Sequence, residues 1–442
     1  MKQLVVIFTL WLAWMPVGAQ KMLTLEECLK LGIENNLSLE GSRNEMRKAK
    51  HLLSENRAKL WPQISAVAGF NDNFNPPVSV TDGSAYGNLY NVTKTLQYNA
   101  SAGLQLQMPL YNQTVYTAVD IARTLNELNC LSYEKAGEAL MMQLSKMYYL
   151  GQNTMEQLTL IQENMVRLRE LRDITLAFFD NGMAMEVDVK RVNINLENQQ
   201  VQYDNAKSML VQQLNLLKYV MDYPADEEIT LTPVDTERIQ SASLTGLRSD
   251  LYELQLLQSQ EKLAGQQKDL IRQGYLPSLT LTGSWMYSAY TDKARHWFHS
   301  GPSNHWYPST GLGITLRVPI FDGFDKRARI RKAQIDQENA RLNYENTLKN
   351  MQTQYLNATN ELMNNQRNFK KQKDNYLLAE DVYQVTTDRY REGIASMTEV
   401  LQDEMRMSEA QNNYLSAHYN YQVANLALLK LTGQMDRLLQ GN

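Results

Sequence analysis

The chain has 442 residues, of which 43% are hydrophobic and 21% are charged, and its formal net charge is -4 at pH 7. This balance provides enough apolar residues for extensive packing. It lacks the positive excess that a polyanion-binding protein needs, which excludes nucleic acid as a partner. No nucleophile and base pair, glycine-rich phosphate loop or cysteine cluster stands out, so we predict neither an enzyme nor a bound cofactor.

The first residues have the pattern of an export signal. Lys2 precedes an apolar run from Leu4 to Trp14, and the small residues Gly18 and Ala19 follow. Signal peptidase cleaves after small residues, so residues 1–19 are predicted to be a signal peptide that is cut after Ala19. The alternative, an uncleaved membrane anchor, needs a longer apolar run than this one. The protein is therefore expected to leave the cytoplasm.

The rest of the chain repeats itself. Three landmarks recur in the same order at offsets of 215, 210 and 211 residues, namely 60–64 with 275–279, 104–111 with 314–321, and 179–184 with 390–395. A nearly constant offset indicates a tandem duplication. We divide the chain into a first repeat at 20–221, an equatorial linker at 222–246, a second repeat at 247–431 and a C-terminal tail at 432–442.

Long helices are predicted on both sides of each turn around 180–184 and 391–395. Pro109 and Gly182 lie 73 residues apart, which in a helix spans on the order of 100 Å. Apolar residues recur at steps of three and four, as in a coiled coil. In the last helix, this spacing predicts the seam Leu401, Met405, Ser408, Asn412, Leu415, Tyr419, Gln422, Leu426 and Leu429.

Four segments of about ten residues alternate between apolar and polar side chains instead. They lie at about 62–72, 98–109, 277–288 and 310–319. Ten alternating residues suit a tilted strand that crosses a bilayer, although four half-buried strands of an ordinary sheet have the same pattern. In lipid an open sheet edge leaves backbone groups unpaired, so the membrane interpretation requires strands from further copies. Two chains give eight strands and three give twelve.

The order of these elements resembles the TolC family of outer-membrane efflux proteins over almost the whole chain. The opening at 23–29 and 35–39, the prolines at the strand ends and the two glycine turns carry the resemblance, the prolines and glycines being Pro62, Pro109, Pro277, Pro319, Gly182 and Gly393. It implies a mainly α fold with a small β part, in which a homotrimer forms a coiled-coil helical barrel and a twelve-stranded transmembrane β-barrel. It also implies a location in the outer membrane and periplasm.

The resemblance further implies partners and cargo. The family docks on a periplasmic adaptor, also called a membrane fusion protein, and an inner-membrane transporter of the RND or ABC class. The expected function is the outer-membrane channel of a tripartite efflux pump for drugs or other small molecules. A type I protein secretion duct is one alternative, and a secreted coiled-coil scaffold without a pore is another. The two repeated strand pairs argue against the scaffold.

Family positions also imply the site residues around the two turns. Tyr390 matches the aromatic gate residue, Asp188 the gate carboxylate and Glu399 an acidic ring position, while Gln402 stands at the second ring position. The adaptor would contact the tip turns at Gly182, Met183, Gly393 and Ile394.

One position departs from the family pattern. Ala395 replaces the arginine expected two residues after the second glycine, and Arg389, Arg391 and Lys190 are the nearest substitutes. Three copies of Glu399 around a lumen would repel one another and raise their pKa values. The competing interpretation treats Asp188 and Glu399 as ordinary first-turn residues favoured by the helix dipole.

Histidines and methionines are weaker candidates for function. His296, His299 and His305 crowd one loop, but no carboxylate or cysteine completes a metal-binding spacing, so no metal site is predicted. The 21 methionines fit a role as packing residues of helices better than one as copper ligands.

Overall fold

The computed structural model describes residues 21–82, 87, 89–234, 246–293 and 305–440. The predicted signal peptide, His296 and His299 lie outside these ranges. The chain divides into two compact units. The first comprises Met1–Glu45, Cys130–Leu256 and Tyr344–Asn442, and the second comprises Met46–Asn129 and Leu257–Asn343.

Helices make up most of the described chain, which confirms the predicted mainly α fold with a small β part. In chain order they are α2 (Leu25–Asn35), α3 (Leu37–Ala58), α4 (Gln113–Asp180), α5 (Glu186–Met221), α6 (Tyr252–Gln273), α7 (Asp325–Arg391), α8 (Met397–Leu431) and the 3-10 helix η4 (Met435–Leu439). Within the described ranges, none of these helices combines the length and apolar character needed to span a membrane.

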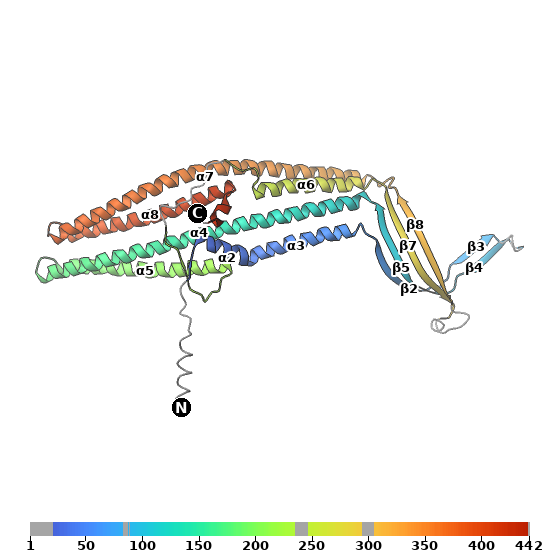
Figure 1. The fold of residues 1–442 in the computed structure, drawn as a ribbon, viewed down its shortest axis with the longest axis horizontal. Helices are drawn as coiled ribbons and strands as arrows, with labels where there is room; N and C mark the ends of the chain where they lie inside the picture. Colours follow the sequence, from blue (N-terminus) through green and yellow to red (C-terminus); the bar gives the residue numbers. More distant parts are fainter. Residues whose placement is uncertain (1–20, 83–86, 88, 235–245, 294–304, 441–442) are drawn as a thin grey trace, which may run out of the picture. The chain divides into compact units, whose positions relative to one another are not determined.

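The second unit contains an antiparallel sheet with the strand order β2-β5-β7-β8 (Figure 1). Its strands are β2 (Gln63–Asp72), β5 (Tyr98–Tyr111), β7 (Ser278–Thr291) and β8 (Trp306–Arg317). The repeat explains the order, since each repeat contributes one pair and the pairs meet at β5 and β7. Within the described chain, β2 and β8 each have one neighbouring strand. Both outer edges of this sheet are therefore open.

The register of the sheet separates apolar from polar side chains. Because alternate residues point to opposite faces, aligned positions form rows across the strands. One row on the first face is Ile64, Leu106, Gly283 and Leu312. The adjacent row on the other face is Ser65, Gln105, Ser284 and Gly311. Ile64 and Leu312 are 69% and 77% exposed in the protomer, so the apolar face is uncovered.

A further hairpin lies between β2 and β5, where no strand was predicted. Strand β3 (Val78–Asp82) pairs antiparallel with β4 (Tyr90–Lys94), with Val80 opposite Val92. Each strand has only five residues, and glycines, prolines and asparagines surround them, so the alternation of apolar and polar side chains is too short to predict a strand. Next to this hairpin, the Pro77 carbonyl accepts a hydrogen bond from the Thr95 N–H at 3.2 Å.

In the first unit, α4 and α5 form one helical hairpin and α7 and α8 form the other (Figure 1). All four helices share a core near the turns, comprising Leu168, Leu171, Val192, Tyr383, Tyr390, Met397, Val400, Leu401 and Met407. A second core lies around β1 (Lys21–Leu23), which pairs parallel with β6 (Ile229–Leu231) in the equatorial linker. Leu23 and Leu231 are almost completely buried there. This two-stranded sheet was not predicted, because each of its strands has only three residues.

The buried face of α8 differs from the predicted seam. Met405 is 58% exposed and Asn412 is also exposed, whereas Glu404, Gln411 and His418 are buried. The prediction assumed a narrow apolar seam facing one helix. In the structure α8 packs against its hairpin partner α7 and also against α4 and α5, so its buried face is broader. Glu404, Gln411 and His418, spaced by seven residues, lie along this buried face.

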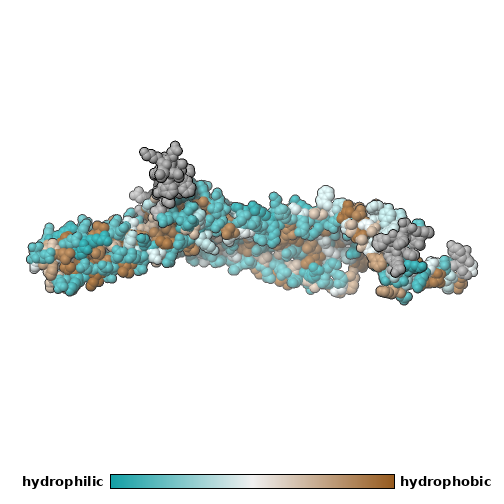
Figure 2. Space-filling view, turned by 90° about the horizontal axis from the view of Figure 1, so that it is seen from below, coloured by the Kyte–Doolittle hydropathy of each residue, from teal (hydrophilic) through white to brown (hydrophobic). Residues whose placement is uncertain are grey.

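Apolar side chains also reach the surface of the first unit. On α5, Val187, Ile194 and Val201 are 45%, 60% and 57% exposed and are spaced by seven residues. Figure 2 shows hydrophobic patches between hydrophilic ones over the helices. A spacing of seven keeps a stripe on one side of a supercoiled helix, as in a coiled coil. This exposed stripe has the form of one half of such a seam.

Candidate functional site

Each of the two turns between long helices is built around a glycine in the left-handed region. Gly182 has φ 73° and Gly393 has φ 74°. The following N–H of Met183 donates to the Phe178 carbonyl at 2.8 Å, and that of Ile394 donates to Arg389 at 2.8 Å. With the glycine N–H bonds to Phe179 and Tyr390, both at 2.9 Å, this is a Schellman cap in each repeat. The two turns therefore have the same backbone conformation and hydrogen bonds. They leave the side chains of Met183 and Ile394 67% and 62% exposed.

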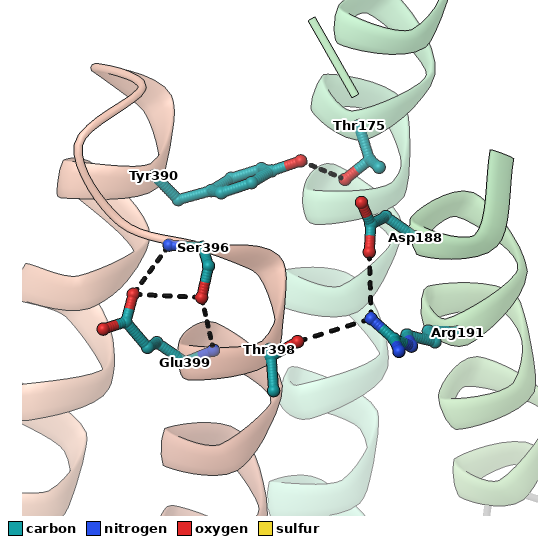
Figure 3. Close-up of polar contacts among 7 residues, drawn as sticks. All are labelled: Thr175, Asp188, Arg191, Tyr390, Ser396, Thr398 and Glu399. Atoms are coloured by element: carbon teal, nitrogen blue, oxygen red, sulfur yellow. Dashed lines mark hydrogen bonds and ion pairs between the residues drawn. The ribbon is translucent and has the colours of Figure 1, made fainter. Parts of the chain in front are cut away.

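The predicted aromatic residue, Tyr390, lies inside the protomer. It is 6% exposed, and its ring packs 5.5 Å from that of Phe178. Its hydroxyl donates to Oγ1 of Thr175 on α4 at 3.4 Å, while the Thr175 hydroxyl itself donates to the Leu171 carbonyl at 2.7 Å. Burial raises the pKa of Tyr390, so its hydroxyl keeps its proton. Tyr390 thus joins α7 of one hairpin to α4 of the other (Figure 3).

The predicted carboxylate, Asp188, has an arginine partner that sequence reasoning missed. Arg191 Nη1 lies 3.2 Å from Oδ1 of Asp188, and the same nitrogen donates to Oγ1 of Thr398 at 3.3 Å. The Asp188 side chain is 14% exposed and that of Arg191 is 49% exposed. Arg191 therefore connects α5 with α8 (Figure 3). The pair is spaced i, i+3 on one helix face, which was the available signal.

The substitutes proposed from sequence have other partners. Lys190 Nζ lies 2.7 Å from Glu186, and Arg391 lies 2.9 Å from Asp388 and 3.9 Å from Glu170. These residues were suggested because they lie near the turns in sequence. Successive side chains of an α-helix point about 100° apart, so nearness in sequence does not bring them to Asp188. Within the protomer, the partner of Asp188 is therefore Arg191 rather than Lys190 or Arg391.

Glu399 is part of a local helix cap. Its carboxylate accepts from the Ser396 N–H at 2.7 Å, and the Glu399 N–H donates to the Ser396 hydroxyl at 3.3 Å, which makes a capping box (Figure 3). The backbone hydrogen bond from Ser396 is the main reason why the pKa of Glu399 is lowered in the protomer. The Ser-x-x-Glu spacing was present in the sequence and was overlooked. The other hairpin has Met185 at this position and no side-chain cap.

The structure brings Tyr390 and Asp188 close together and places Glu399 on the neighbouring helix start. The Asp188 charge contributes to the raised pKa of Tyr390. Gln402 is exposed one turn further along α8. Together these residues link the two hairpins through two polar contacts, Tyr390 with Thr175 and Arg191 with Thr398. Within the described ranges, no three His, Cys, Asp or Glu side chains are grouped so that they could hold a metal ion.

The family model for outer membrane efflux proteins matches residues 29–221 and 250–434, which is most of the chain. The chain belongs to this family. The first matched segment lies within the predicted first repeat, and the second overlaps the predicted second repeat at 247–431. The efflux protein is accordingly an outer-membrane channel protein with a TolC-like, mostly helical fold that extends into the periplasm, in a family of channels rather than enzymes.

Known relatives of this efflux protein are distant in sequence but close in fold. Outer membrane protein TolC of Vibrio cholerae serotype O1 is 23% identical over 325 residues, covering 70% of this chain and 68% of that protein. The structure of CusC is 17% identical with a TM-score of 0.75, covering 92% of this chain and 91% of that chain. The open-state structure of the Neisseria gonorrhoeae outer membrane channel MtrE is 19% identical with a TM-score of 0.72, covering 92% and 88%.

Proposed function

We propose that three copies of this protein form a continuous duct, with twelve strands crossing the outer membrane and the long helices enclosing a periplasmic tunnel. The observation that carries the proposal is the four-stranded sheet with two open edges and one exposed apolar face. An unpaired edge leaves N–H and C=O groups unsatisfied in hydrocarbon, at several kcal/mol each. Pairing with a neighbouring copy removes that penalty.

The strand directions allow the ring to close. β8 runs antiparallel to β7, and β2 runs antiparallel to β5, so β8 of one copy can pair antiparallel with β2 of the next. This contact joins two different surfaces, and such a contact closes into a ring when the rotation fits. Three copies give twelve strands, which is wide enough to leave a lumen. The polar row with Ser65 and Gln105 would then face that lumen.

Exposed aromatic side chains at both ends of the strands support the membrane placement. Trp61 and Phe321 are 71% and 76% exposed just beyond the helix-side ends of β2 and β8. Phe70 and Trp306, which lie on the apolar face, are 58% and 43% exposed toward the opposite ends. Aromatic belts of this kind mark the two interfaces of a bilayer.

We further propose that the exposed stripe on α5 packs against a helix of the next copy, which would turn three pairs of hairpins into a closed tunnel. The candidate gate then lies at its narrow end. In this arrangement the Tyr390–Thr175 and Arg191–Thr398 contacts hold the two hairpins of each copy together when the tunnel is shut. Glu399 and Gln402 would line the constriction, where three carboxylates favour cations.

The exposed apolar side chains of Met183 and Ile394 make the turns suitable for docking. We propose that a periplasmic adaptor binds there and connects the duct to an inner-membrane RND or ABC transporter. The cargo we propose is drugs or other small molecules, because the matched family is that of efflux proteins. A type I protein secretion duct would use the same architecture, and membership of a channel family argues against the scaffold without a pore.

Disulfide trapping tests the assembly. In a background where Cys28 and Cys130 are replaced by serine, Ser65→Cys in β2 is combined with Ser309→Cys or Thr315→Cys in β8. Two strands separate these positions within a protomer, about 14 Å at 4.8 Å per strand, which is beyond disulfide reach. We expect covalent trimers on a denaturing gel from outer-membrane fractions, with either single cysteine as the control. A soluble periplasmic monomer without crosslinks would refute the proposal.

A further inference from the structure

The two hairpins of the protomer are also joined by a buried polar layer further from the turns. Asn164 on α4 and Gln411 on α8 are 2% and 3% exposed. Their side-chain amides bond reciprocally, with Asn164 Nδ2 donating to Gln411 Oε1 at 2.7 Å and Gln411 Nε2 donating to Asn164 Oδ1 at 3.3 Å. This pair satisfies a donor and an acceptor on each side, which is what a buried amide requires.

A second buried pair also joins the two hairpins, seven residues nearer the turns on α8, but one of its hydrogen bonds is missing. Gln199 on α5 and Glu404 on α8 are 6% and 4% exposed. Gln199 Nε2 donates to Glu404 Oε1 at 3.2 Å, yet the buried Gln199 Oε1 has no hydrogen-bond partner. An ionised carboxylate can only accept, so it cannot satisfy that oxygen. A neutral carboxyl group has one O–H to donate and would complete the pair.

The surroundings of Glu404 favour the neutral form. Burial raises its pKa, against smaller lowering effects of the Gln199 hydrogen bond and the Arg167 charge. The guanidinium of Arg167 on α4 is bonded to Asn164 and lies 3.8 Å from Glu380 of α7, while its buried Nε has no hydrogen-bond partner in the part of the chain that the structure describes. The facing group on α7 is Tyr383, which is buried and whose pKa is also raised by burial.

The charged neighbours on the same helix are occupied as well. Asp403 accepts from the Thr386 hydroxyl at 2.8 Å and lies 3.1 Å from Arg406. Among the described residues, Arg167 is therefore the cation that faces Glu404 from another helix, and it is shared with Glu380. No full ion pair compensates a negative charge on Glu404 while the hairpins are packed.

We propose that Glu404 is a positioning residue of the gate: its neutral carboxyl donates to Gln199 and latches the two hairpins together, and loss of its proton releases the latch. This inference rests on the proposed channel function. For a carboxyl group whose pKa is higher in the packed state than in the opened state, the contribution to packing is complete below the ordinary glutamate pKa and is lost as the pH rises through the raised value. Acid therefore favours the shut tunnel, and alkaline pH favours opening.

The test compares Glu404→Gln with wild type and with Glu409→Gln, an exposed glutamate on the same helix. Glutamine at 404 supplies a permanent N–H donor for Gln199 Oε1. Open probability in planar bilayers should rise severalfold from a pH below the ordinary glutamate pKa to an alkaline pH in wild type and in Glu409→Gln. In Glu404→Gln we expect the low value at both, in trimers shown to be intact.

Infrared spectroscopy of the purified trimer supplies a readout that needs no channel activity. We expect a protonated carboxylic acid band that persists above the ordinary glutamate pKa, and that is absent in Glu404→Gln and present in Glu409→Gln. Channels whose pH response is the same in all three proteins, or a Glu404 that titrates as an ordinary glutamate, would overturn the inference. A trimer that carries no current at any pH would instead refute the channel proposal, and the infrared titration would still decide whether Glu404 is neutral.

Discussion

The contact between Tyr390 and Thr175 allows a quantitative test of the gate. Tyr390→Phe keeps the ring against Phe178 and removes only the hydroxyl that reaches across to the other hairpin. A net neutral hydrogen bond contributes about 0.5–1.5 kcal/mol, and a length of 3.4 Å places this one in the lower half of that range. With about 0.5–1 kcal/mol lost in each of three protomers, the trimer loses about 1.5–3 kcal/mol of closed-state stability.

That loss should raise the ratio of open to closed channels by about tenfold to a hundredfold in single-channel recordings. Tyr223→Phe is the control, because it removes a hydroxyl contact to Glu227 that lies within the equatorial linker, away from the turns. Thr175→Val should reproduce the effect, and the double variant should add little to either single change. Unchanged gating in both Tyr390→Phe and Thr175→Val would refute the reasoning, and so would an equal change in Tyr223→Phe.

Three further expectations follow from the turns and the core. Glu399→Ala should weaken cation selectivity. Because the Ser396 cap lowers the pKa of Glu399, the cation selectivity of the wild type should persist as the pH falls to the ordinary glutamate pKa. Loss of selectivity well above that pH would mean that the three carboxylates raise one another's pKa. Gly393→Ala forces alanine to φ 74° at about 1–2 kcal/mol and should lower the thermal midpoint, whereas Gly137→Ala within α4 should not. In a Cys130→Ser variant, Cys28 should resist maleimide until urea unfolds the protein, since it is fully buried and burial raises its pKa to about 12; rapid native labelling would contradict this core.

The periodic parts of the fold were accessible from sequence because a single feature determined each of them. Helices of more than 60 residues repeat the 3.6-residue period many times, and the repeat located both glycine turns. The seam of α8 was not accessible in this way. Met405 fits an apolar spacing and Glu404 does not, yet Glu404 is the buried one, because the choice depends on which helices surround α8.

The candidate site likewise has a part that could be predicted from sequence and a part that could not. Glycine at both turns could be predicted from the backbone conformation that reverses a helix, and the Ser396 and Glu399 cap was visible as a four-residue motif. The contact from Tyr390 to Thr175 joins residues 215 apart, and the one from Arg191 to Thr398 joins residues 207 apart. Such pairs exist only once two hairpins have packed, so local sequence patterns do not contain them.

The small parallel sheet of β1 and β6 has a consequence for how the chain matures. Leu23 at one end of the sequence is buried with Leu231 from the linker and with Met435 and Leu438 from the 3-10 helix that follows α8. These segments emerge from the export machinery at the beginning, middle and end of translocation. The core that joins them cannot close until Met435 and Leu438 have crossed, and a chain terminated before these residues leaves it open to periplasmic proteases. The closed core therefore requires all three segments, β1, β6 and η4, in one translocated chain.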